Sequence, residues 1–257
     1  MVEPAQPVHP APPGRPIVSL TLNTYTRQAA WQGLTRMGTD HLYLRRRPGL
    51  RFYRLLGTGR GSELTLGADL RRWARLAVWS SPEALEDFEA GAWRARERAR
   101  TLSSCTYVLR PVRWRGQWGG VDPFGESGPP EPDGPAAAQP AGPVAVLTRA
   151  SIRPSRLLSF WRAVPAAQLP LRDQPGLLFA VGVGEVPLLH QATFSVWRSA
   201  EDMKAFAYGS AAHRQVIART QQEHWYREEL FARFTVLEFR GNSSDCGSQD
   251  AADERLI

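Results

Sequence analysis

The segment VWSSPEALEDF at residues 78–88 is repeated as VWRSAEDMKAF at residues 196–206, and this repeat is the main evidence for the fold. In both copies an apolar run ends at a tryptophan, and a serine then precedes a stretch with apolar residues at helical spacing. Upstream, PGLRF at 48–52 matches PGLLF at 175–179. Two matching segments of roughly 100 residues indicate a duplicated domain, because solenoid repeats are much shorter.

Both copies contain the same order of periodic patterns. Alternating or β-branched runs predict strands, and apolar residues at helical spacing predict helices. In the first copy the predicted elements are 17–24, 28–37, 50–56, 73–79, a helix from Ser81 toward Arg100, and 105–112. In the second copy they are 144–147, 154–164, 177–183, 190–197, a helix from Ser199 toward Arg219, and 231–239. The order βαββαβ is the ferredoxin-like plan, an α+β fold.

One face of such a four-stranded sheet lacks a helical cover, and two copies in one chain can press these faces together. We therefore predict two ferredoxin-like βαββαβ repeats packed as an intramolecular dimeric α/β barrel. The predicted parts are a disordered tail at 1–16, a first half at 17–120, a Pro/Gly/Ala-rich linker at 121–143, a second half at 144–241 and a disordered tail at 242–257.

Charge and composition narrow the class of protein. The 257 residues have a formal net charge of +7, and residues 17–120 carry 18 basic against 8 acidic side chains. A basic chain suggests a polyanion partner, and basic and aromatic residues mix in stretches such as RPVRWRGQW at 110–118, which could stack bases. We predict no nucleic-acid partner, and we read the charge as an arginine-rich surface for an acidic protein or for lipid headgroups.

The sequence lacks the usual features of membrane-spanning, secreted and disulfide-rich proteins. No apolar run approaches the roughly 20 residues that span a bilayer, and the first residues do not form a signal peptide. Cys105 and Cys246 are too few for a disulfide framework, and they do not form a zinc motif. These observations predict a reduced, cytoplasmic protein with at most a peripheral contact with the inner face of the membrane.

Two histidines are candidates for chemistry. On the predicted strand 190–197, His190 shares a face with Phe194 and Val196, and His213 follows Phe206 by seven residues on the next helix. The alternative for each is a histidine without a chemical role, either hydrogen-bonded in the fold or exposed to solvent. The sequence contains no zinc-type histidine spacing and no G-x-S-x-G nucleophile elbow.

Several runs resemble the spheroidene monooxygenase family, the carotenoid ketolases of purple bacteria and their relatives. They are GPVAVLTRASIRP at 142–154, FW at 160–161, VGEVPLLHQATFSVW at 183–197 and WYREELFARF at 225–234, with weaker similarity in the first half. The resemblance implies a dimeric α+β barrel. It also implies O₂-dependent hydroxylation of a carbon on a long apolar polyene, and a second hydroxylation of that carbon gives a ketone.

The resemblance further implies haem and a ferredoxin-type electron donor, because side chains alone do not activate O₂. His213 is the first choice for the haem ligand, since it resembles the histidine that ligates haem in the haem-degrading monooxygenases of this superfold. Ala95 takes the equivalent position in the first half. His190 is the rival ligand, and Arg227 and Arg149 are candidates to pair with haem propionates.

The residues are also compatible with two other classes of protein. One is a barrel-fold binding protein without catalysis. The other is a cofactor-free monooxygenase of the quinone or antibiotic type, in which the substrate itself reduces O₂.

Overall fold

The computed structural model describes residues 16–59, 67–125, 142–168, 174–186, 189–209, 219–220, 223–241 and 246, with only the backbone described at 163–168 and 208–209. The first half contains β1 (Ile17–Thr24), α1 (Ala30–Leu44), β2 (Leu50–Gly59), β3 (Ala68–Trp79), α2 (Pro82–Glu89), α3 (Ala92–Ala99) and β4 (Ser103–Gly116). The second contains β5 (Val144–Ile152), a 3-10 turn (Pro154–Arg156), α4 (Leu157–Gln168), β6 (Leu177–Val186), β7 (His190–Trp197), α5 (Ala200–Gly209) and β8 (Tyr226–Arg240).

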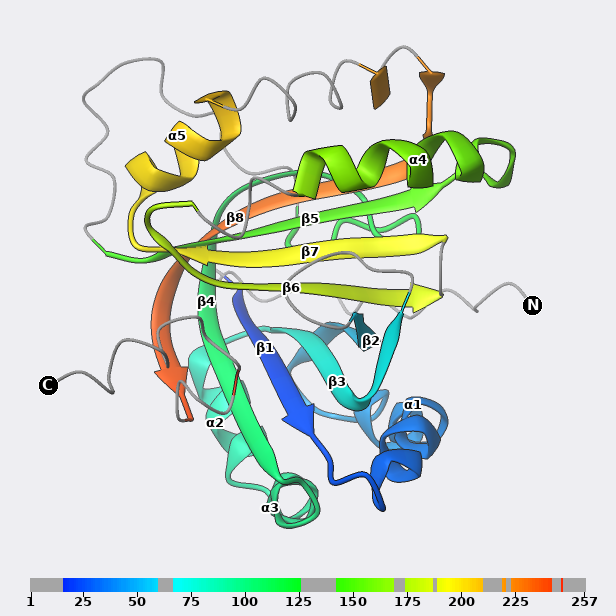
Figure 1. The fold of residues 1–257 in the computed structure, drawn as a ribbon. Coiled ribbons are helices and arrows are strands. Elements are labelled where there is room, and N and C mark those ends of the chain that lie inside the picture. The colour runs from blue at the N-terminus through cyan, green and yellow to red at the C-terminus, as the bar shows by residue number, and fades with distance from the viewer. Residues whose placement is uncertain are drawn as a thin grey trace, which may run out of the picture.

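The eight strands close into one antiparallel barrel in the order β1-β3-β2-β6-β7-β5-β8-β4. The halves join through β2 with β6 and through β4 with β8, where the pairing runs from Thr106 opposite Arg240 to Gly116 opposite Leu230. Helices of the two halves lie on opposite sides of the barrel (Figure 1). The predicted α+β class and intramolecular barrel are therefore confirmed.

Strand alternation divides the apolar residues into an interior core and two outer layers. The interior is rich in aromatic side chains from both halves. These include Phe52, Tyr107, Phe179, Phe194 and Phe234. Trp79 and Phe88 pack in the outer layer of the first half, and Trp197 and Met203 pack in that of the second. The repeated tryptophans are thus packing residues.

The predicted helix starts are confirmed in both halves. The Ser81 side chain accepts a hydrogen bond from the Ala84 amide, and the Ser199 side chain accepts one from the Asp202 amide. The single helix expected toward Arg100 is instead two helices, α2 and α3. The chain breaks at Gly91, whose backbone is extended before α3 begins.

The prediction of reduced cysteines is wrong. Cys105 on β4 forms a disulfide with Cys246, and both are buried in the interior core. Arg72 of β3 donates a hydrogen bond to the Cys246 carbonyl at 2.9 Å, so Cys246 is bound to two strands of the first half. The sequence separation of 141 residues concealed this pairing. None of the helices in the described parts of the chain is long and apolar enough to span a membrane.

Candidate functional site

A buried polar cluster lies inside the barrel where the two halves meet. Glu185 on β6 follows the interior positions Val181 and Val183 at strand spacing, so its carboxylate faces the core. Arg54 of the first half approaches it with an Nε–Oε1 distance of 2.7 Å. Arg149 on β5 approaches its other oxygen with an Nη2–Oε2 distance of 3.4 Å. Glu185 therefore connects arginines from both halves.

Glu228 on β8 is the second carboxylate of this cluster. It forms an ion pair with Arg149 and accepts hydrogen bonds from the Gly119 amide at 2.8 Å and the Gly120 amide at 2.7 Å. Burial raises the pKa of this carboxyl, but the two amides and Arg149 outweigh burial and lower its pKa below the ordinary value. Glu228 thus stays ionised and holds the turn that follows β4.

Trp118 completes the cluster from the same turn. The Arg149 guanidinium lies 5.4 Å from the centre of its ring, and the Arg54 guanidinium lies 5.9 Å from it. Three donors of the cluster are buried without a hydrogen bond among the residues that the structure describes: Trp118 Nε1, Arg149 Nε and Arg54 Nε, the last of which is ion-paired with Glu185. The cluster balances two arginines with two glutamates and keeps spare donors in an apolar interior.

His190 lies at the edge of this cluster. Its Nδ1 is 3.7 Å from Glu185 Oε2, and its side chain is partly exposed. The predicted face is confirmed, because Phe194 and Val196 belong to the interior core. His213, the other predicted ligand, lies outside the described residues. A haem-ligating role for either histidine stays a prediction.

The two candidate propionate partners occupy different environments. Arg149 is buried and paired inside the barrel. Arg227 is exposed, and it is the extra residue of a bulge, because Glu228 pairs with Ser151 while Tyr226 pairs with Ile152. Binding of a propionate by Arg149 would compete with its ion pair to Glu228, whereas Arg227 is not paired with that carboxylate.

A second candidate region is the outer face of the second-half sheet. Thr148 on β5 lies between Thr193 of β7 and Phe231 of β8. Its counterpart in the first half is Thr21, which lies between Arg75 of β3 and Thr106 of β4. Thr21 is fully buried and hydrogen-bonded to Thr106, whereas Thr148 is exposed. The two halves therefore differ at the same place in the fold.

Ion pairs fill this place in the first half. Arg75 reaches Glu97 of α3, and Glu97 also pairs with Arg94, all three being buried. In the second half, Thr193 takes the place of Arg75. Gly182, which pairs with Thr193 on β6, is buried, and Phe231 flanks Thr148 on the other side and is partly exposed.

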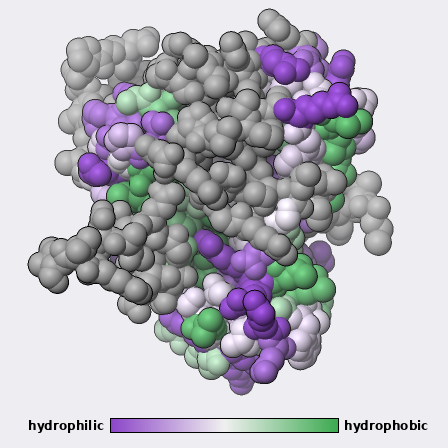
Figure 2. Space-filling view, viewed as in Figure 1, coloured by the Kyte–Doolittle hydropathy of each residue, from purple (hydrophilic) through white to green (hydrophobic). Residues whose placement is uncertain are grey.

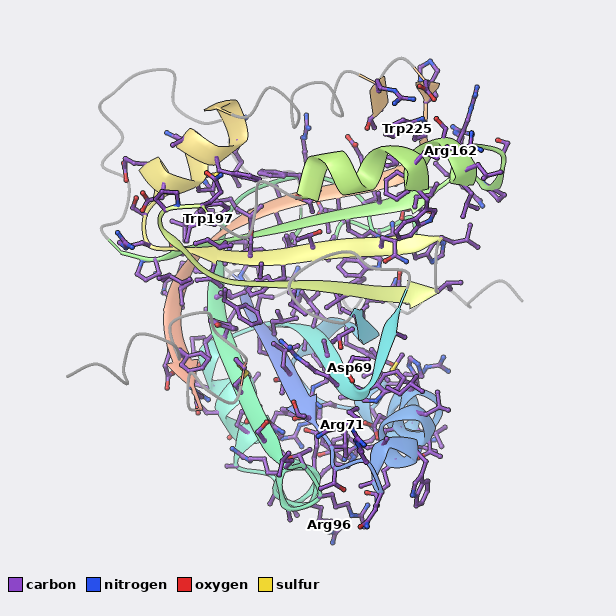
Figure 3. The ribbon with its side chains drawn as sticks, viewed as in Figure 1. Asp69, Arg71, Arg96, Arg162, Trp197 and Trp225 are labelled. Carbon is purple, nitrogen blue, oxygen red and sulfur yellow. A yellow bond between two sulfur atoms is a disulfide. The ribbon has the colours of Figure 1, made fainter. Side chains whose placement is uncertain are left out.

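The helices over the second-half sheet form two separate apolar clusters. One lies under α5 and contains Trp197 and Met203, and the other lies by α4 and contains Phe160 and Trp225. Figure 3 places Trp197 beneath α5 and Trp225 beside α4, at opposite ends of the sheet. The exposed Thr148 is on the strand that runs between these clusters.

The sequence did not assign a role to Arg54, Glu185, Glu228 or Trp118. One signal was available for Glu185 and Glu228, because each stands on the interior face of its strand, where the next interior positions are apolar. Within the described ranges, no group of three or more His, Cys, Asp and Glu side chains could hold a metal ion.

Comparison with solved structures supports the barrel. Two aldoxime dehydratases, one of them in complex with butyraldoxime, match with TM-scores of 0.58 and 0.56 at 10% and 14% identity. The matches cover 90% and 95% of this chain and 81% and 88% of those chains. At such identities the similarity concerns the fold alone.

Comparison with curated sequences concerns most of the chain, although no protein-family model matches it. A spheroidene monooxygenase of Rhodobacter capsulatus is 35% identical over 231 residues, covering 88% of this chain and 92% of that protein. The enzyme of the same name from Rubrivivax gelatinosus is 36% identical, covering 76% of this chain and 72% of that protein. A third, from Cereibacter sphaeroides, is 33% identical, covering 79% of this chain and 61% of that longer protein. The chain therefore belongs to the spheroidene monooxygenase family and is an oxygen-dependent monooxygenase.

Proposed function

We propose that this enzyme is a haem-dependent monooxygenase that hydroxylates one carbon of a spheroidene-like carotenoid or a similar long apolar molecule. The name of its relatives supports the substrate class. One hydroxylation consumes O₂, two electrons and two protons, and yields the alcohol and water. A second hydroxylation of the same carbon gives a geminal diol, which loses water to form a ketone. A ferredoxin-type protein is the proposed electron donor.

The observation that carries the haem proposal is the exposed sheet face around Thr148. In the first half the equivalent face is covered by the Arg75–Glu97 ion pair, whereas here Thr148 is exposed and its neighbours Thr193 and Phe231 are partly exposed. Two threonines and a phenylalanine on a sheet, with apolar clusters at both ends, form a surface that a flat apolar macrocycle could cover. The residues present therefore fit haem on this face.

Chain connectivity supports His213 as the proposed ligand. It comes four residues after the last residue of α5, and α5 lies over the second-half sheet (Figure 1). Of the two candidate arginines, Arg227 is exposed and is retained as a propionate partner. A bound haem would supply the O₂ activation that side chains lack. The apolar clusters beneath α4 and α5 would exclude water from it.

Absorbance of the purified protein tests the ligand. Protein expressed with a supply of haem should show a Soret band, and His213→Ala should lose it, while His41→Ala, on α1 of the other half of the barrel, should keep it. Loss of the band in His190→Ala alone would assign the ligand to His190. A colourless protein that still consumes O₂ with substrate would favour the cofactor-free route. A protein with neither band nor turnover would contradict the proposal.

A second variant tests the site independently of activity. Thr148→Phe places a bulky ring on the proposed haem surface, so the haem content per chain should fall by at least about tenfold. Thr39→Phe, at an exposed position of α1, is the matched control and should keep full haem content. Equal haem content in both variants would contradict a haem site at Thr148.

A further inference from the structure

Helix α1 of the first half presents an apolar stripe to solvent. Trp31, Leu34 and Leu42 are 63%, 61% and 73% exposed, which makes them three of the most exposed large apolar side chains among the described residues. Their spacing of three and eight residues places all three on one side of the helix, with Gly38 between them. Isolated exposed apolar residues are common, but an aligned set on one helix indicates a binding surface.

The fold does not use this stripe. The opposite side of α1 faces the sheet, where Gly33 lies against the indole of Trp73 and Leu44 packs in the outer core of the first half. Asp40 is also on the buried side. The helix is thus anchored without Trp31 or Leu34, and the stripe exposes apolar area at a cost in solvation.

Charge around the stripe is positive. Arg27 precedes α1, and Arg45 and Arg46 follow it, and all three are exposed. Asp40, the acidic residue of α1, is bound to Arg36 with an Nε–Oδ2 distance of 3.0 Å. The outward face of the helix therefore combines apolar side chains with cationic ends and carries no carboxylate.

Another exposed leucine lies near α1, on β3, but it is reached from the buried side of the helix and is not part of the stripe. Leu70 is exposed, and its carbonyl accepts a hydrogen bond from the Trp73 indole at 2.9 Å. That indole packs against Gly33 of α1, so Leu70 lies beside the helix. Figure 2 shows apolar and charged residues next to one another on the surface over α1.

We propose that the outward face of α1, defined by Trp31, Leu34, Leu42, Arg45 and Arg46, docks on an anionic lipid bilayer. A helix with this composition lies in the plane of the interface, with its apolar side chains below the headgroups and its arginines at the phosphates. Tryptophan is favoured at that depth because its ring is amphipathic. An acidic protein surface would satisfy the arginines but would leave the aligned leucines and tryptophan without an apolar phase. This inference does not depend on the haem proposal.

Vesicle co-sedimentation of the full chain tests the proposal. Wild-type protein should bind vesicles that contain phosphatidylglycerol, and it should bind pure phosphatidylcholine vesicles much less. Arg45→Gln with Arg46→Gln should weaken binding to anionic vesicles about 25-fold at low salt, since each arginine near such a surface is worth about fivefold. Trp31→Gln and Leu34→Gln should each weaken it about tenfold, because each removes an inserted apolar side chain.

The matched control is Leu158→Gln. Leu158 on α4 is 71% exposed, comparable with Leu42, but it lies on the other half of the barrel. This variant should bind vesicles like the wild type, and all variants should retain the wild-type melting temperature because the replaced side chains are exposed. Unchanged vesicle binding in the α1 variants, or equal loss in Leu158→Gln, would overturn the proposal. So would a wild-type dimer in solution that the Trp31 and Leu34 variants convert to monomer, since the stripe would then be a contact between copies.

Discussion

Glu97 of α3 and Arg75 of β3 form a buried ion pair with an Oε1–Nη1 distance of 2.7 Å. Glu97 also binds Arg94 through its other oxygen at 2.6 Å, and Arg36 of α1 reaches it at 3.2 Å. One carboxylate therefore joins two helices to the sheet of the first half. The second half has Thr193 at the position equivalent to Arg75. The ion-pair network is therefore a feature of the first half, and the second half lacks the arginine at its centre.

Glu97→Gln should destabilise the protein strongly. The substitution keeps the shape of the side chain but leaves three arginines without their shared charge, and loss of one partner of a buried pair typically costs about 3–5 kcal/mol. Urea unfolding followed by circular dichroism measures the change. Glu201→Gln, at an exposed position in the first turn of α5, is the control and should leave the midpoint nearly unchanged. A midpoint equally insensitive to both substitutions would show that the network is not stabilising.

The same residue predicts a pH dependence. Burial raises the pKa of Glu97, but the charges of Arg75 and Arg94 outweigh it and hold that pKa below the ordinary value of 4.5. A depressed pKa in the folded state gives stability that is complete above the unfolded pKa and is lost as the pH falls through the folded pKa. The difference in unfolding free energy between wild type and Glu97→Gln should therefore be constant near neutral pH and should shrink below about pH 4.5. A difference that grows in acid would contradict this sign.

The sequence predicted the elements of the fold well because each strand and helix has its own periodicity. His190–Trp197 agrees at both ends, and the repeat predicted the barrel. The predicted ends of elements are wrong where contacts between residues distant in the sequence set them. β8 begins at Tyr226, before the predicted residue 231, because its first part pairs with β5. Likewise α1 continues past the predicted residue 37 to Leu44, so that His41 lies on it, with its Nδ1 3.0 Å from the Tyr53 hydroxyl.

The candidate site was harder to predict than the fold. Arg149 and His190 were chosen from family-like runs, but their partner Glu185 also requires Arg54 from the other half. That contact depends on the pairing of β2 with β6, which no local pattern encodes. A charged residue at an interior strand position indicates that a partner exists without identifying it.

Removal of the disulfide should cost stability. The Cys105→Ala/Cys246→Ala variant frees a loop of 141 residues in the unfolded chain, and losses of about 2–5 kcal/mol are typical for native disulfides. Chemical unfolding with and without reductant measures it, and reductant should destabilise the wild type but not the double variant. Thiol titration of the denatured protein provides the direct check. Two free thiols before reduction would contradict the pairing.

The turn that holds Glu228 offers a matched pair of glycines. Gly119 and Gly120 both have positive φ, at 66° and 77°, so alanine should strain the backbone similarly at each. A Cβ on Gly119 would lie 2.7 Å from Arg54 Nη2, whereas one on Gly120 would meet nothing within 4 Å. Gly119→Ala should therefore destabilise the protein by about 1–2 kcal/mol more than Gly120→Ala, because it displaces a buried arginine.

A double-mutant cycle separates that displacement from backbone strain. In an Arg54→Met background the Gly119 methyl group no longer confronts a guanidinium paired with Glu185, so the extra cost of Gly119→Ala over Gly120→Ala should fall close to zero. The free energies come from urea unfolding of the six proteins that combine these backgrounds. If the extra cost persisted without Arg54, the strain would lie in the turn itself and the contact between Gly119 and Arg54 would not be its source.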